Sequence, residues 1–132
     1  MVGALLGSGF ILLVRRSGRV GEIRMMAIGL IVTALIYVPL AVLGSDRSWL
    51  VLETGGLAIF GVLAWLGMRS PAWLALGWVG HVAWDVGLHL DRTQSVVDRW
   101  YPLFCVGFDL IVAGYLLSLA LPRLRASGER RQ

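Results

Sequence analysis

Five ionisable side chains lie inside apolar stretches of the sequence: Glu53, His81, Asp85, His89 and Asp109. Such groups cost a few kcal/mol each in a membrane helix, and no Lys or Arg lies within the same stretches to offset them. An apolar pocket favours the neutral, protonated form of a carboxyl group, which can then donate a proton near neutral pH. Asp85 and Asp109 are therefore predicted to act as general acids or proton carriers. The alternative is that they hydrogen-bond between helices.

The spacing of three of these residues predicts that they share one face of a helix. His81, Asp85 and His89 follow an i, i+4, i+8 pattern, which rotates by only about 40° at each step. Trp78 and Trp84 belong to the same stretch, so aromatic rings are expected near the polar stripe. The pattern predicts a polar pocket inside a helix bundle, walled by aromatic side chains.

The two histidines also raise the hypothesis of a bound metal ion, while no other cofactor is expected. Two imidazoles and a carboxylate, from His81, Asp85 and His89, suit zinc or non-haem iron. Residues at i and i+8 are about 12 Å apart along a helix, so Glu53 or Asp109 would have to complete the site. The alternative is that the histidines are hydrogen-bonded interior side chains or, for His89, a solvated one near the membrane surface.

Further side chains are predicted to line a substrate pocket, namely Trp84, Trp78, Tyr37 and His89. The indole of Trp84 would stabilise a cationic intermediate through its π-face. Tyr37 has the alternative role of a helix contact, and Glu53 has that of extending to the membrane surface. The predicted catalytic residues are Asp85, Asp109, Glu53 and His81.

Five apolar stretches, separated by short charged or Pro- and Gly-marked breaks, must position these side chains. They cover residues 2–14, 25–44, 49–67, 71–90 and 102–121, and a basic tail at 122–132 is expected to fray. The chain is 58% hydrophobic and 15% charged, whereas soluble domains carry about 25% charged residues. We therefore predict an all-α, polytopic transmembrane helix bundle that forms one domain over residues 1–132.

The first stretch, residues 2–14, is shorter than a full membrane span. At about 1.5 Å per residue it reaches roughly 20 Å, against about 30 Å for the hydrocarbon core. It is either a shallow span or a surface helix, so the bundle has five or four spans. Gly3 and Gly7 lie on one face of this stretch and would let another helix approach closely. Pro71 suits the first turn of the fourth span.

The arginines predict how the bundle sits in the membrane. One side of the predicted topology holds nine of them, Arg15, Arg16, Arg19, Arg24, Arg69, Arg123, Arg125, Arg130 and Arg131, and the other holds Arg47, Arg92 and Arg99. For a protein of a bacterial inner membrane, the positive-inside rule then places the C-terminus on the cytoplasmic side. The same rule explains the net charge of +4, so nucleic acid is not expected as a partner. In this orientation the carboxyl groups of Glu53, Asp85 and Asp109 share the outer half of the bilayer, roughly 6 to 14 Å below its boundary.

The run Gly77-Trp78-Val79-Gly80-His81-Val82-Ala83-Trp84-Asp85, followed by His89 and by a last span with Cys105 and Phe108-Asp109, resembles a family of small bacterial integral membrane proteins of unknown function. Leu88-His89 stands here where that family has two adjacent histidines. The resemblance implies a membrane-helix fold. A fainter likeness, by type of site only, is to membrane-embedded terpene and carotenoid cyclases and sterol isomerases, whose intramembrane acids protonate isoprenoid double bonds.

The leading functional hypothesis is a small intramembrane enzyme that does acid/base chemistry, of the isomerisation, cyclisation or hydration type, on a lipid-soluble, isoprenoid-like substrate. Asp85 would donate the proton, Asp109 or Glu53 would be its base or electrostatic partner, and His81 would relay protons. The alternatives are a proton- or ion-coupled transporter and a non-catalytic membrane accessory or binding subunit. A chain this short, without an inverted repeat, disfavours alternating access unless it forms a homo-oligomer. Expected partners are membrane lipids and a lipid-soluble small molecule.

Overall fold

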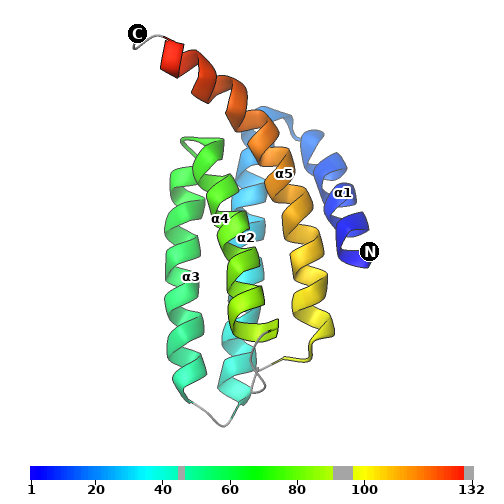
Figure 1. The fold of residues 1–132 in the computed structure, drawn as a ribbon, viewed down its shortest axis with the longest axis vertical. Coiled ribbons are helices and arrows are strands. Elements are labelled where there is room, and N and C mark those ends of the chain that lie inside the picture. Colours follow the sequence, from blue (N-terminus) through cyan, green and yellow to red (C-terminus); the bar gives the residue numbers. More distant parts are fainter. Residues whose placement is uncertain (45–46, 91–96, 130–132) are drawn as a thin grey trace.

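The chain is helical along nearly all of its described length, with no strand among the described residues (Figure 1). The computed structural model describes residues 1–44, 47–90 and 97–129, with side chains as far as Leu121. The elements are α1 (Val2–Arg15), α2 (Gly18–Leu43), α3 (Arg47–Gly67), α4 (Pro71–Trp84), the π-helical turn η1 (Asp85–Leu90) and α5 (Trp100–Glu129). The predicted all-α class is confirmed for these residues.

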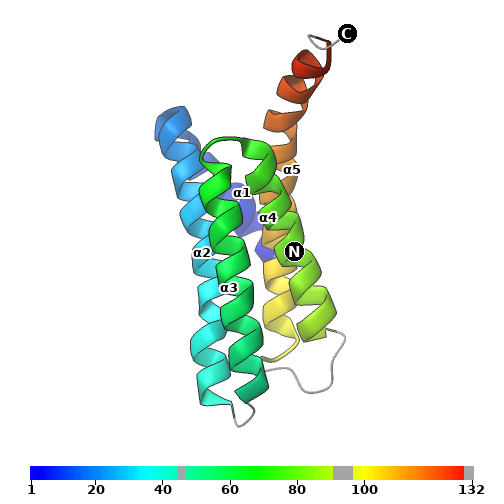
Figure 2. The ribbon, with the colours of Figure 1, turned by 90° about the vertical axis from the view of Figure 1, so that its left-hand side faces the viewer.

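Helices α2, α3, α4 and α5 run alternately up and down the bundle, and α1 lies along α5 (Figure 1). The end of α1, the start of α2 and the α3–α4 turn lie at the same end of the bundle (Figure 2). Gly18 has a φ of 69°, a left-handed conformation that suits glycine, at the sharp turn from α1 into α2. Pro71 begins α4 as predicted, since its missing N–H is not needed in a first turn.

Helix α1 packs directly against the backbone of α5 through glycines. A Cβ atom on Gly3 would lie 2.0 Å from the carbonyl oxygen of Phe104, and one on Gly7 would lie 2.9 Å from that of Phe108. Only residues without side chains permit such an approach, which strengthens van der Waals packing between membrane helices. Gly3 and Gly7 thus act as their spacing predicts. They also place α1 along the bundle rather than across its end.

The surface of the bundle is apolar as well as its centre. The fully buried apolar side chains at the centre include Met26, Leu30, Leu74, Trp78, Val112 and Leu116. Large apolar side chains, among them Leu5, Leu12, Leu35, Ile59 and Leu110, also point outward. Three helical segments, Gly18–Leu43, Arg47–Gly67 and Trp100–Leu121, are long and apolar enough to cross a membrane. These features indicate a membrane protein.

Three elements differ from the predicted bounds by more than two residues or in the type of helix. Helix α2 begins at Gly18 instead of residue 25, because the charged residues before Met25 form its first turns rather than a loop. Helix α5 continues to Glu129, so the backbone of 122–129, in the tail that was expected to fray, is helical, while 130–132 lie outside the described residues. The fourth stretch changes at Asp85 from an α-helix to the wider π-helical turn η1.

Candidate functional site

His81 on α4 lies at the centre of a buried group of titratable side chains. Its Nδ1 atom is 2.7 Å from Oδ2 of Asp109 on α5, which is a hydrogen bond, and 3.8 Å from Oδ2 of Asp85 at the start of η1. All three side chains have no exposed surface. We call these three residues the His81 cluster. Two acidic residues that are far apart in the sequence thus contact one imidazole.

Several polar atoms of the His81 cluster make no hydrogen bond with any described residue. They are Nε2 of His81, both carboxyl oxygens of Asp85 and Oδ1 of Asp109. The hydroxyl group of Tyr37, on α2, lies beside Asp85 but without hydrogen-bond geometry. A buried polar group without a partner costs about 1–3 kcal/mol, and native proteins pair nearly all such groups. These atoms are therefore the ones expected to exchange protons or to contact a ligand.

His89 belongs to a second group, which involves α3. Its Nε2 atom lies 3.2 Å from Oε1 of Glu53, and the other oxygen of Glu53 accepts a hydrogen bond of 3.3 Å from the indole nitrogen of Trp84. We call these three residues the His89 cluster. The side chain of Glu53 is only 2% exposed, so it does not extend to the membrane surface.

Aromatic rings join the two clusters. The ring of Tyr37 stacks on His89 with 4.3 Å between centroids, and its hydroxyl group faces Asp85. The ring of Phe60 meets both His81 and Trp84 edge-on, at 5.0 and 5.8 Å. The result is one continuous polar and aromatic site built from α2, α3, α4, η1 and α5.

The π-helical turn separates the two histidines that the spacing placed on one stripe. The prediction assumed about 100° of rotation per residue from His81 to His89, whereas η1 has the wider i→i+5 geometry from Asp85 onward. Asp85 stays beside His81, while His89 contacts Glu53 and stacks between Tyr37 and Trp49. Single π-helical turns occur frequently at functional sites.

The first tryptophan of the resembling motif lies in the apolar core. Trp78 is fully buried in the apolar core, where its ring is 5.8 Å from that of Phe108 and packs against Gly29. Among the described residues its ring makes no contact with a histidine ring, and its role in a substrate pocket stays a prediction. Cys105 is a buried, free cysteine whose thiol lies beside the Tyr37 and Tyr101 hydroxyls and near Asp85 and Asp109, so it borders the His81 cluster.

The metal hypothesis acquires a different set of ligands. His81, Asp85 and Asp109 each offer one atom, and these atoms lie within 4.8 Å of one another, so they could hold a metal ion. Asp109 thus takes the place that the sequence assigned to His89. However, two ligands of a tetrahedral zinc with bonds of about 2.0–2.1 Å are roughly 3.3 Å apart. The separation of 2.7 Å between His81 and Asp109 is that of a hydrogen bond, and the pair would have to open before both could bind one ion.

A buried carboxyl group at the other end of the bundle was missed. Glu22 is 5% exposed, accepts a hydrogen bond from the Tyr115 hydroxyl and has Arg19 Nη1 at 3.5 Å. The charged residues around it had suggested a loop. Its spacing to Met26 and Leu30, four and eight residues on, could have shown that it shares their buried face.

These observations define the class of the chain: a helical membrane protein with carboxyl and imidazole groups buried between its helices. The chain belongs to the family described as "Family of unknown function (DUF6010)", whose profile matches residues 1–122. That range contains both polar clusters. The prediction of an uncharacterised family is confirmed, whereas the proposed motif, the bacterial origin and the likeness to cyclases stay predictions. No curated protein and no solved structure matches the chain.

Proposed function

We propose that this chain is a small intramembrane enzyme that uses the His81 cluster for acid/base chemistry on a lipid-soluble, isoprenoid-like substrate. One observation carries the proposal. His81 is hydrogen-bonded to Asp109 through Nδ1, while its Nε2 and the neighbouring Asp85 make no hydrogen bond among the described residues. A positioned base and a positioned acid thus lie side by side in apolar surroundings.

Each member of the His81 cluster takes a distinct role. A carboxylate at Asp109 accepts the Nδ1–H of His81, which fixes the ring and leaves the lone pair on Nε2 free to take a proton. Among the described residues only the histidines could place a positive charge beside Asp85, and burial of a carboxyl group favours its neutral acid form. Asp85 is therefore the proton donor, His81 the proton acceptor and Asp109 the positioning residue.

An isomerisation illustrates the chemistry. Asp85 transfers its proton to one carbon of a C=C bond, which forms a C–H bond and leaves a positive charge on the other carbon. His81 Nε2 then removes a proton from a carbon next to that charge, and the electrons of the broken C–H bond form the new double bond. After the product leaves, His81 releases this proton to the solvent and the Asp85 carboxylate takes up a proton from the solvent, which restores the site. Cyclisation has the same acid and base, with ring closure between the two proton transfers.

The surrounding rings suit a cationic intermediate. Phe60 and Tyr37 have ring centroids 5.0 and 6.2 Å from that of His81, and the faces of such rings attract cations. Apolar walls also exclude the water that would otherwise capture the cation. Trp84 is only partly buried and packs tightly against Gly56 of α3, where a Cβ atom would lie 2.7 Å from the indole. The indole of Trp84 therefore fills the contact between α3 and α4 beside the site.

A proton- or ion-coupled transporter is the alternative, and the core argues against it. The polar groups at the two ends of α2 are Glu22 and Tyr37, and the fully buried Met26 and Leu30 lie between them. On α4, Leu74 and Trp78 separate His81 from the end of the bundle where Glu22 lies. A continuous polar path across the membrane would have to cross this apolar layer. No observation favours an accessory subunit over the enzyme.

The proposal includes the placement of the chain in a bacterial inner membrane with its C-terminus in the cytoplasm. Arg15, Arg16, Arg19 and Arg69 lie around the end of the bundle where α1 ends, α2 begins and α3 turns into α4. Arg47 and Arg99 lie at the opposite end. Under the positive-inside rule the first end is cytoplasmic and both polar clusters lie toward the outer leaflet.

The test is conversion of lipids by the purified chain. Wild-type protein, Asp85→Asn, Asp109→Asn and a matched control are incubated with the total neutral-lipid extract of the expressing cells. The control is Asp98→Asn, which changes an exposed aspartate outside the site. We expect the wild type and Asp98→Asn to convert the same hydrocarbon lipid and Asp85→Asn to leave it unchanged. Full conversion by both Asp85→Asn and Asp109→Asn would refute the assignment.

A further inference from the structure

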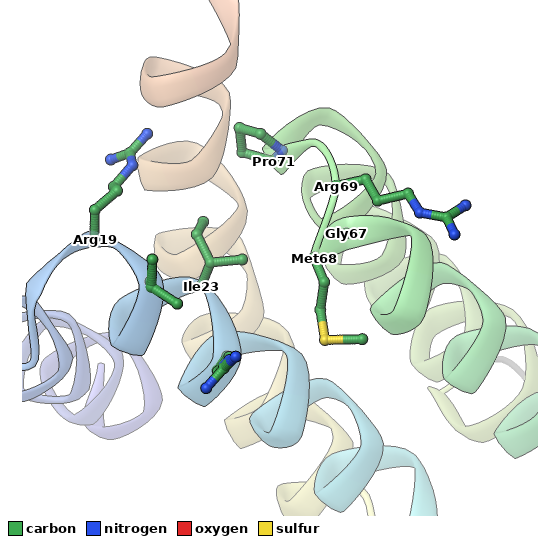
Figure 3. A pocket seen from close by; sticks show the side chains of 8 residues that line it. Arg19, Ile23, Gly67, Met68, Arg69 and Pro71 are labelled. Atoms are coloured by element: carbon green, nitrogen blue, oxygen red, sulfur yellow. The ribbon is translucent and has the colours of Figure 1, made fainter.

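We propose that a pocket at the arginine-rich end of the bundle binds the phosphate group of an anionic phospholipid. The pocket has a volume of about 270 Å³ and lies between the start of α2 and the α3–α4 turn (Figure 3). Three arginines line it, Arg19, Arg24 and Arg69, together with apolar residues that include Ile23, Met68 and Pro71. It shares no residue with the His81 or His89 cluster, so it is independent of the proposed catalytic function.

The charges around the pocket are not balanced by the protein. Arg19 is 3.5 Å from Glu22, whose carboxyl group also accepts a hydrogen bond from Tyr115. Arg24 and Arg69 have no carboxylate within ion-pair distance among the described residues. The first turn of α4, which begins at the pocket with Pro71, contains no acidic residue, and the start of a helix carries a partial positive charge. The pocket therefore favours an anion.

Exposed tryptophans place the pocket at the level of the lipid headgroups. Trp65 and Trp73 flank the α3–α4 turn and are 51% and 45% exposed. Tryptophan is enriched where the hydrocarbon core meets the headgroup region. The guanidinium group of Arg69 lies over the ring of Trp65, 4.3 Å from its centroid, and so is held at the same level.

The shape of the pocket suits a headgroup rather than a whole lipid. Its volume lies just below the roughly 300–1,000 Å³ of pockets that enclose drug-sized ligands. Ile23 and Met68 supply apolar side chains to the lining between Arg19 on one side and Arg69 on the other (Figure 3). Both arginine side chains are exposed, and that of Arg69 would have to leave the ring of Trp65 to reach a phosphate group in the pocket. The acyl chains would stay outside, along the apolar surface of the helices.

The experiment measures lipid binding to the full chain in detergent by native mass spectrometry. The probes are phosphatidylglycerol, the neutral zwitterion phosphatidylcholine and inorganic phosphate alone. The proteins are the wild type, the double variant Arg24→Gln/Arg69→Gln and the control Arg16→Gln, which removes an exposed arginine outside the pocket. A basic residue near an anionic headgroup contributes about 1 kcal/mol, so the double variant should bind phosphatidylglycerol roughly 30-fold more weakly.

Retained tight binding of phosphatidylglycerol in Arg16→Gln, together with weak binding of phosphatidylcholine, would support the pocket. Equal affinity of the wild type and the double variant, or an equal loss in Arg16→Gln, would overturn it. Binding of inorganic phosphate as tight as that of the lipid would assign the pocket to free phosphate and overturn the lipid headgroup. Thermal midpoints without lipid show whether the variants are folded. Asp85→Asn should bind the lipid like the wild type, which separates this test from that of the enzyme.

Discussion

Replacing Asp109 with asparagine separates the positioning role of this carboxyl group from its contribution to packing. Asparagine has nearly the same shape, but it carries no charge and can donate as well as accept a hydrogen bond. In the native protein Oδ2 of Asp109 lies 2.7 Å from His81 Nδ1, and as a carboxylate it keeps the proton on that nitrogen. An amide that donates to Nδ1 moves the proton of the neutral imidazole to Nε2, where the proposed base needs a lone pair.

The expected losses differ between activity and stability. Turnover by Asp109→Asn should fall by about 10²–10⁴-fold, the contribution of a positioned general base. Its stability should fall by less than about 1 kcal/mol, because one hydrogen bond replaces another. Asp109→Ala should lose about 1–3 kcal/mol in addition, because it leaves the fully buried Nδ1 of His81 without a partner.

The assay combines lipid turnover with nitrogen NMR of the imidazoles. The chain contains two histidines, so a ¹⁵N-histidine sample has two rings, and a His89→Asn sample assigns them. We expect His81 to carry its proton on Nδ1 in the wild type and on Nε2 in Asp109→Asn. A variant that keeps the native tautomer and the native turnover would refute the role given to Asp109.

Three further predictions concern the packing of α1 on α5, the buried carboxyl group of Glu22 and metal binding. Gly3→Ala should lose about 1–3 kcal/mol of stability, because its Cβ would lie 2.0 Å from the Phe104 carbonyl oxygen. The control Gly9→Ala, whose Cβ would have nothing within 4 Å, should keep its stability. Equal thermal midpoints of the two variants would contradict the α1–α5 contact. Tyr115→Phe should lower the thermal midpoint, by about 1–3 kcal/mol in stability, because buried Glu22 loses its hydroxyl donor; an unchanged midpoint would show that this bond adds nothing. Elemental analysis of the purified chain should show no stoichiometric transition metal, because His81 and Asp109 lie at hydrogen-bond distance. One metal ion per chain that is lost in His81→Ala would contradict the acid/base scheme.

Features that depend on composition and local spacing could be predicted from the sequence. Apolar runs of membrane length predict helices, since lipid leaves the backbone no partner but itself. Pro71 marked the start of α4, and the spacing of Gly3 and Gly7 marked a close helix contact. The expectation that Glu53, Asp85 and Asp109 share one depth also follows from counting residues, and the structure places all three in one connected site.

Pairings between particular side chains could not be predicted in the same way. The pattern of apolar residues does not predict the change from α-helical to π-helical geometry at Asp85. The separate environments of His81 and His89 therefore could not be predicted from the sequence. The partner of each histidine depends on how α3 and α5 are rotated against α4. Glu22 was missed for another reason, because the charges beside it outweighed its spacing to the buried Met26 and Leu30.

Incorporation of deuterium from the solvent tests the proposed chemistry most directly. The wild-type chain in detergent is incubated with neutral lipids in deuterium oxide, and the hydrocarbon products are analysed by mass spectrometry. Since Asp85 exchanges its proton with the solvent between turnovers, the account predicts products that carry deuterium on carbon with the wild type and none with Asp85→Asn. Products without deuterium, or labelling that Asp85→Asn leaves unchanged, would contradict proton transfer from this residue.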